Sequence, residues 1–297
     1  GMALNCRPEL LRLTMHNPYS DLPKPQPIKY RGVETLQEVL TSFQKSTDQL
    51  FYEVLDIPLQ EYESKKSLKV SWHSPSAEEV CVINLLLDKE ATVGHALQEL
   101  VRRPELSTKV AAAGGGGAPQ IDHPLSGRRL RMMEVFNHRI YKVFNESDDI
   151  DSINDQYWTI RAEEVPPEEE ALPSDEKPLH VRHFYRDARM NMTQNFGDPF
   201  LLHVGADETT AAVRARIQAK LGISADELAK WKLAVVSFGR VEYLEDDELV
   251  KARFRKHDHY GNWDDYLGLE HAQTPGAHRK KHQARTGYAD KPVKIYG

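Results

Sequence analysis

Two cysteines and 13 histidines are the residues of this 297-residue sequence that could support nucleophilic or metal chemistry. A cysteine protease needs a thiol, a histidine base and an Asp or Asn that orients the base. Cys81 lies in an apolar run at residues 80–83, which predicts a buried and inert strand residue. Cys6 lies in a segment with no regular hydrophobic period. We therefore expect no catalytic residue in this chain.

The histidines and glycines also lack the patterns of a cofactor site. His278 and His282 enclose three basic residues, whose charges would repel a divalent cation, and His257 and His259 have no thiolate or carboxylate cluster beside them. The glycine run at 114–117 has no following lysine or helix cap, which argues against a phosphate-binding loop. We expect neither a metal nor another cofactor.

The composition is that of an ordinary soluble protein of about two domains, with 40% hydrophobic and 28% charged residues. The net charge of −6 makes nucleic acid an unlikely partner. No apolar run approaches the ~18 residues of a membrane span. Two cysteines rule out a disulfide scaffold and favour a reducing compartment, the nucleus or the cytoplasm.

Charge and proline are unevenly distributed along the chain. Residues 145–176 carry 12 acidic residues and one Arg. The sequence VPPEEEALPSDEKP at 165–178, which overlaps them, predicts an exposed linker and a domain boundary near Pro173. Residues 110–119 are rich in Gly and Ala and predict a flexible insertion. The first 30 residues contain five prolines and are expected to be irregular. Residues 275–297 form a basic tail.

Hydrophobic patterns predict the same order of elements twice, about 100 residues apart: two strands, a helix and three strands. The first unit has expected strands at 68–74, 79–88, 130–136, 139–144 and 157–165, and a helix at 93–103. The second has expected strands at 179–185, 200–204, 232–238, 241–244 and 263–269, and a helix that ends at Gly222. A helix at 33–46 and a strand at 50–58 precede both units.

A hairpin, a helix and a returning hairpin form one sheet with a helix across it, which is the ubiquitin-like β-grasp. The fold class is therefore α+β, with two tandem β-grasp domains. We expect an irregular segment at 1–30, a first domain at 31–172 with a helix-strand extension, a second domain at 173–274, and the tail at 275–297.

Several long motifs resemble one family. They are LFYEVLDIPLQEYESKKSLKVSWH, LRMMEVFNHRIYKVF, INDQYWTIRAEEVP, QNFGDPFLL, YLGLEH and the terminal KPVKIYG. Together they resemble the C-terminal region of the herpesvirus-associated type of ubiquitin-specific protease, in its plant and algal form, over residues 10–297. The resemblance implies the last two of several tandem ubiquitin-like domains of a deubiquitinating thiol protease. The catalytic Cys-box and His-box motifs of that family are absent, so the fragment itself is expected to be inactive.

The tail has the features of a strand that docks on a protein. Its apolar residues have little else to bury them, and Val293 and Ile295 would point to one side of an extended chain. The resemblance implies that the tail binds the protease domain of the same enzyme and favours its active arrangement. The expected contact residues are Tyr288, Lys291, Val293, Lys294, Ile295 and Tyr296.

Two functions remain open at the level of sequence. In one, the chain is a regulatory region that activates the protease domain through the tail, while its ubiquitin-like domains bind protein substrates or regulators. In the other, it is only a scaffold that recruits partners, and the tail is passive. The acidic strip after Trp158 is a candidate surface for a basic partner, although a solvated linker is the simpler interpretation.

Overall fold

The computed structural model describes residues 6–17, 22–29, 49–104, 106, 127–170, 176–187, 192–254, 265–272 and 293–294. The chain divides into two compact units. The first comprises residues 1–67, 86–89 and 279–297, and the second comprises residues 68–85 and 90–278. The predicted helix at 33–46, the insertion at 110–119 and the predicted boundary at Pro173 lie outside the described residues.

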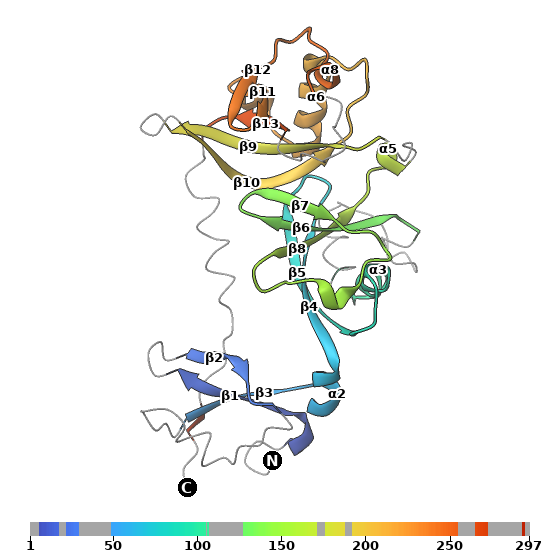
Figure 1. The fold of residues 1–297 in the computed structure, drawn as a ribbon, viewed down its shortest axis with the longest axis vertical. Helices are drawn as coiled ribbons and strands as arrows, with labels where there is room; N and C mark the ends of the chain where they lie inside the picture. Colours follow the sequence, from blue (N-terminus) through green and yellow to red (C-terminus); the bar gives the residue numbers. More distant parts are fainter. Residues whose placement is uncertain are drawn as a thin grey trace. The chain divides into compact units, whose positions relative to one another are not determined.

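The first unit contains a sheet with the strand order β14-β3-β1-β2 (Figure 1). Its elements are the 3-10 helix η2 (Pro8–Leu10), β1 (Leu11–Asn17), β2 (Leu22–Pro27), β3 (Gln49–Val54), α2 (Leu59–Ser64) and β14 (Val293–Lys294). Strand β1 is antiparallel to both β2 and β3.

This sheet corrects two expectations. Residues 1–30 were predicted to be irregular, but they supply β1 and β2. The prolines of β2 are tolerated because β2 is an edge strand, where a missing backbone N–H removes no ladder hydrogen bond on the outer side. The strand predicted at 50–58 as part of an extension of the first domain is instead β3, which belongs to a separate sheet with β1 and β2.

The second unit begins with a β-grasp domain whose strand order is β5-β4-β8-β6-β7. Strands β4 and β8 are parallel, and β6 is antiparallel to β7 and β8. The elements are β4 (Lys65–His73), β5 (Glu79–Asp88), α3 (Val93–Val101), β6 (Leu130–Phe136), β7 (Arg139–Val143), the 3-10 helix η3 (Ile150–Ser152) and β8 (Thr159–Glu164). We call this the first domain.

A second β-grasp domain repeats the arrangement with the order β10-β9-β13-β11-β12, and β9 and β13 are parallel. Its elements are β9 (Leu179–Asp187), β10 (Met192–Leu202), α6 (Thr210–Leu221), α7 (Ala225–Leu228), β11 (Lys232–Ser237), β12 (Arg240–Tyr243), α8 (Val250–Arg253) and β13 (Tyr266–Glu270). The short helix α5 (Pro167–Glu170) precedes it. The duplicated order confirms the α+β, β-grasp prediction.

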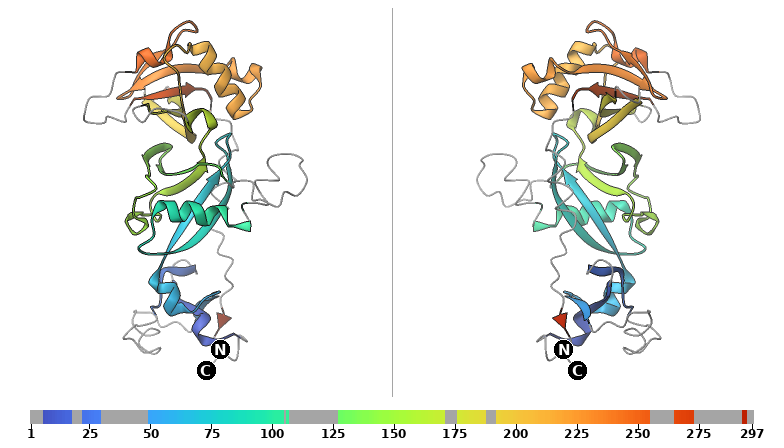
Figure 2. Two further views of the ribbon diagram at one scale, coloured as in Figure 1. Left: turned by 90° about the vertical axis from the view of Figure 1, so that its right-hand side faces the viewer. Right: turned by 90° about the vertical axis from the view of Figure 1, so that its left-hand side faces the viewer.

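Each domain has its main core between the helix and one face of the sheet (Figures 1 and 2). The apolar side of α3 is buried through Val93, Ala96, Leu97 and Leu100. In the second domain, Val213 and Ile217 of α6 join one buried cluster with residues of the sheet. Because side chains alternate across a strand, the opposite face of each sheet remains for other contacts.

Local signals set the ends of the helices. Thr92 caps α3 in a capping box with His95, and the Thr209 side chain accepts a hydrogen bond from the backbone N–H of Ala212 at the start of α6. Helix α6 ends at Gly222, whose φ of 63° is the left-handed conformation that glycine adopts freely. Within the described part of the chain, no helix is long and apolar enough to cross a membrane.

Candidate functional site

The sheet face of the first domain opposite α3 carries charged residues and is buried. Strand β8 lies between β4 and β6, and its residues alternate between the two faces. Ile160 and Ala162 belong to the buried apolar set, whereas Arg161 and Glu163 are the charged residues that alternate with them and are 1% and 6% exposed. This face meets β10 of the second domain, and we call the contact the junction.

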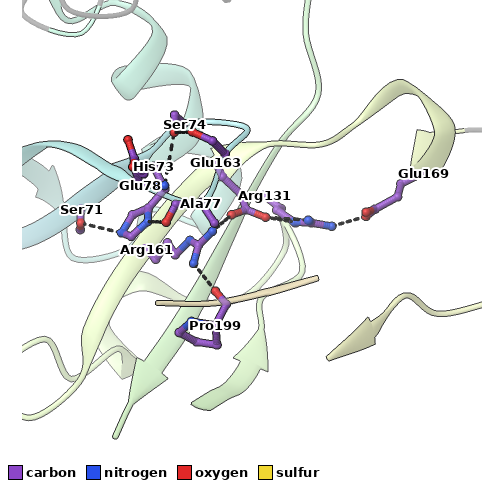
Figure 3. A network of polar contacts seen from close by, with 11 residues as sticks. Ser71, His73, Ser74, Ala77, Glu78, Arg131, Arg161, Glu163, Glu169 and Pro199 are labelled. Atoms are coloured by element: carbon purple, nitrogen blue, oxygen red, sulfur yellow. Dashed lines mark hydrogen bonds and ion pairs between the residues drawn. The ribbon is translucent and has the colours of Figure 1, made fainter. Parts of the chain in front are cut away.

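Arg161 is the central residue of the junction (Figure 3). Its guanidinium donates one hydrogen bond to the backbone oxygen of Pro199 in β10 and forms an ion pair with Glu163. Arg131 of β6 donates to the same Glu163 carboxylate, with an Nε–Oε1 distance of 2.8 Å, and also pairs with Glu169 of α5. One chain of charges therefore connects β6, β8, α5 and β10.

Mutual pairing keeps these groups ionised despite their burial. Burial opposes the charged form of Glu163, but the guanidinium groups of Arg161 and Arg131 outweigh it and lower the pKa of the carboxyl group. Lys220, in the last turn of α6, interacts electrostatically with the same charges, and burial lowers its pKa. A buried charge that loses its partner is strongly destabilising, and in this arrangement of the two domains each of these carboxylates keeps an arginine partner.

The turn between β4 and β5 holds a second polar cluster, which lies within the first domain beside the junction. His73 interacts through Nδ1 with the backbone oxygen of Ala77 at 3.2 Å and through Nε2 with Ser71 Oγ at 3.1 Å. Ser71 Oγ in turn donates to Glu79 at 2.6 Å. Burial lowers the pKa of His73 to about 4, and Arg161 adds to this effect. Ala77, with a φ of 63°, is itself part of the second domain's buried apolar cluster.

Apolar and backbone contacts complete the junction. Met133 and Ile140 of the first domain form one buried cluster with Leu201 of β10. His138, in the turn between β6 and β7, lies with its Nδ1 2.6 Å from the backbone oxygen of Gly197. The sheet face of the first domain is therefore buried against β10 of the second domain, and these contacts hold the two domains together.

The junction corrects the prediction for the acidic segment. The sequence VPPEEEALPSDEKP, residues 165–178, was expected to be an exposed linker. Instead, residues 167–170 form α5, and Glu169 is 9% exposed because Arg131 draws its carboxylate into the network. Glu163 is buried in the same way. Neither carboxylate is available to a basic partner.

The chain matches the family described as "Ubiquitin-specific protease C-terminal" over residues 49–275, a range that contains both β-grasp domains and the junction. The chain belongs to the ubiquitin-specific protease family. It is 45% identical over 291 residues to ubiquitin C-terminal hydrolase 13 of Arabidopsis thaliana, covering 97% of this chain and 24% of the relative. Hydrolase 12 of the same plant is 46% identical over 291 residues, with the same coverage.

A more distant relative is ubiquitin carboxyl-terminal hydrolase 7 of Drosophila melanogaster, which is 25% identical over 285 residues and covers 91% of this chain and 22% of the relative. The chain therefore spans about a quarter of the length of the curated relatives it matches. It corresponds to the C-terminal, ubiquitin-like region of ubiquitin-specific proteases.

Only part of the predicted tail site can be placed. Val293 and Lys294 form β14, which pairs with Leu50 and Gln49 of β3. Tyr288, Lys291, Ile295 and Tyr296 lie outside the described residues. The partner predicted for the tail was the protease domain, so this pairing shows strand formation but leaves that prediction open.

The two cysteines occupy different settings. Cys81 lies in β5 and is 7% exposed, as the apolar run around it predicts. Cys6 is partly exposed and lies in the other unit. Across the ranges that the structure describes, no three His, Cys, Asp or Glu side chains are grouped so that they could hold a metal ion.

Sequence reasoning missed the junction, although one signal was present. Strand β8 reads TIRAEE, with Arg161 and Glu163 two residues apart, so that both lie on one face of a central strand. Charged residues in a central strand indicate either that this face of the sheet is exposed to solvent or that the charges pair with other buried polar groups. Arg131, the partner of Glu163, is 32 residues away, and Pro199, the partner of Arg161, is 38 residues away, which is why no local pattern identifies them.

A second surface feature lies on the first domain. The aromatic rings of Phe136, Tyr141 and Trp158 contact one another, with ring centroids 4.8 to 6.3 Å apart. Phe136 and Tyr141 remain 50% and 41% exposed. The guanidinium of Arg139 lies 4.8 Å from the centre of the Tyr141 ring. Exposed aromatic residues beside an arginine are typical of the energetic centres of protein interfaces.

Proposed function

We propose that this chain is the non-catalytic regulatory region of a deubiquitinating cysteine protease. Its two β-grasp domains form a rigid platform, and its C-terminal tail activates the protease domain of the same enzyme by binding the active state better than the inactive one. Membership of the ubiquitin-specific protease family supports the placement of this region in a deubiquitinating enzyme. The burial of Cys81 in β5 supports the non-catalytic part, because a nucleophilic thiol has to reach its substrate.

The observation that carries the tail mechanism is the pairing of β14 with β3. It means that residues 293–294 adopt an extended conformation and form backbone ladder contacts when a strand edge is offered. Strand addition of this kind provides affinity through main-chain hydrogen bonds and specificity through alternate side chains. The basic tail residues Lys291 and Lys294 would add electrostatic steering towards an acidic surface.

The test is turnover of a fluorogenic ubiquitin substrate by the isolated protease domain of the parent enzyme. The chain is added in trans in three forms: intact, truncated after Thr286, and with Val293→Ala and Ile295→Ala combined. Gln283→Ala is a matched tail control. We expect the intact chain and the control to raise the rate, and the other two forms to have no effect. Equal rates with all forms would refute activation by the tail.

A second candidate function, recruitment of protein partners, is favoured by the Phe136–Tyr141–Trp158 surface. Recruitment predicts that Tyr141→Ala in the full-length enzyme slows cleavage of ubiquitin from protein substrates and leaves turnover of the fluorogenic substrate unchanged. Tyr157→Ala is a suitable control, because Tyr157 is 74% exposed. If Tyr141→Ala slows neither reaction, this surface recruits no substrate.

A further inference from the structure

The three sheets of the chain invite a strand-by-strand comparison (Figure 1). In both β-grasp domains the last strand lies between an antiparallel strand on one side and a parallel strand on the other. In the first unit, β3 has the antiparallel neighbour β1 on one side. The place on its other side, which a parallel strand holds in the two domains, is taken by β14, and β14 runs antiparallel.

Strand β3 is well fixed by the rest of its own unit. It pairs with β1 in unbroken register from Leu11 opposite Val54 to Met15 opposite Leu50. Leu50 and Phe51 are 2% and 3% exposed. Beyond the strand, the backbone N–H of Leu55 donates to the oxygen of Leu10 at 2.8 Å. The outer edge of β3 is thus a rigid row of backbone donors and acceptors, and such an edge readily accepts another extended segment.

We propose that the outer edge of β3 is a strand-receiving site and that the chain's own tail, through residues 293–294, is its occupant. Given the proposed function, this pairing withholds the tail from the protease domain, so the two sites compete for one segment. The pairing is short, with Val293 opposite Leu50 and Lys294 opposite Gln49. A ladder of two residues contributes few hydrogen bonds, each of modest net strength, so the tail can be displaced.

The register supplies a variant that acts on this edge and spares the rest of β3. Gln49 pairs with Lys294, whereas the pairing with β1 extends only to Leu50. Proline at position 49 removes an amide hydrogen and places a ring at the edge, and proline is tolerated at the first residue of a strand. Gln49→Pro should therefore weaken tail docking and leave β1 in place. Gln49→Ala, which keeps the amide, is the matched control.

Hydrogen exchange of the intact chain, measured by mass spectrometry or NMR, tests the site directly. We expect truncation after Thr286 to speed exchange of those amides at 49–51 that face β14 by about threefold or more. Gln49→Pro has no amide at position 49, so its effect is followed at residues 50 and 51, and Gln49→Ala should stay close to the intact chain. Of the adjacent amides of Tyr52 and Glu53, the one that faces β1 should stay protected in every form, which shows that β1 and β3 remain paired. Unchanged exchange at 49–51 after truncation would overturn the proposal. So would protection of these amides that survives truncation and rises with protein concentration, because a second copy of the chain would then occupy the edge of β3.

The activation assay then tests the competition. With the protease domain present, the Gln49→Pro chain should reach half-maximal stimulation at a concentration about two- to fivefold lower than the Gln49→Ala chain. Equal stimulation by both chains would overturn competition while leaving activation by the tail intact. If no form stimulates the protease domain, the proposed function fails, and the exchange result alone decides whether β3 receives the tail.

Discussion

Acidification from pH 7 to pH 5 should destabilise the second unit through two buried histidines. His73 contacts Ser71 and the backbone of Ala77 at the junction, and burial lowers its pKa to about 4. His183 of β9 lies with its Nδ1 2.9 Å from Nε2 of His271. Burial, and then the charge of His271, lower the pKa of His183 to about 3.

The sign and size follow from the proton uptake of the two states. Below an ordinary histidine pKa of 6.5, the unfolded chain binds a proton at each position, whereas the folded chain stays neutral until the pH approaches 4 or 3. The stability is therefore complete above pH 6.5 and is lost as the pH falls. A window of about 1.5 pH units at about 1.4 kcal/mol per unit gives about 2 kcal/mol per histidine by pH 5.

The assay is urea unfolding of the whole chain at pH 5, 6 and 7, followed by tryptophan fluorescence. His73→Gln and His183→Asn should each reduce the loss of unfolding free energy between pH 7 and pH 5 by about 2 kcal/mol, whatever their effect at pH 7. His95→Gln is the control, because His95 caps α3 from a surface position and Gln can serve the same capping box.

One result would refute this reasoning: a pH dependence between 5 and 7 that is the same in His73→Gln, His183→Asn and the unmodified chain. The buried carboxylate of the junction does not obscure the measurement. Glu163, whose pKa is lowered by its two arginine partners against the effect of burial, contributes stability that is lost only below about pH 4.5.

Three further substitutions test packing, capping and the junction. Gly268→Ala should lower the free energy of unfolding by about 1–3 kcal/mol in urea titrations, because a Cβ there would lie 2.6 Å from the Phe184 ring. Gly205→Ala is the control and should change this free energy by less than about 0.5 kcal/mol, because the atom nearest to its Cβ would be 3.6 Å away. Thr209→Ala should cost about 1 kcal/mol in the same titration through loss of the α6 cap. Arg161→Met should destabilise the junction by about 3 kcal/mol, because it leaves the carboxylate of Glu163 without one of its partners. NMR relaxation should then give the two domains distinct rotational correlation times. One shared correlation time would contradict the role of Arg161 in holding the two domains together.

Much of each β-grasp domain could be predicted because its signals are local. Strand β5 and strand β6 have the predicted bounds, and α6 ends at Gly222 as the glycine indicated. Strand β10 is longer than predicted and extends from Met192 to Leu202, across Gly197. Its register with β9 shifts between Phe196 and Phe200, as at a β-bulge. A bulge interrupts the alternation of apolar and polar residues, so the sequence pattern there predicts a loop.

The first unit was harder to predict because its composition suggests the wrong structure. Pro23 and Pro27 point to irregular chain when the position of the strand in the sheet is unknown. In β2 they lie at an edge, where only one side of the strand needs donors. The edge position depends on pairing with β1, which is a tertiary fact.

The sequence by itself determined the main strands and helix of each β-grasp domain and their order, the inert character of Cys81, and the likeness to ubiquitin-specific proteases, because periodicity, capping residues and long motifs are properties of contiguous segments. Only the tertiary structure decided which charges are buried together. Arg161 and Glu163 are two residues apart on β8, but Arg131, which pairs with Glu163 and Glu169, comes from β6. Arg161 also donates to Pro199 of β10, so the desolvation of these charges is offset in part by groups 32 to 38 residues away. The same holds for β14, whose place beside β3 depends on an open strand edge more than 200 residues earlier in the chain.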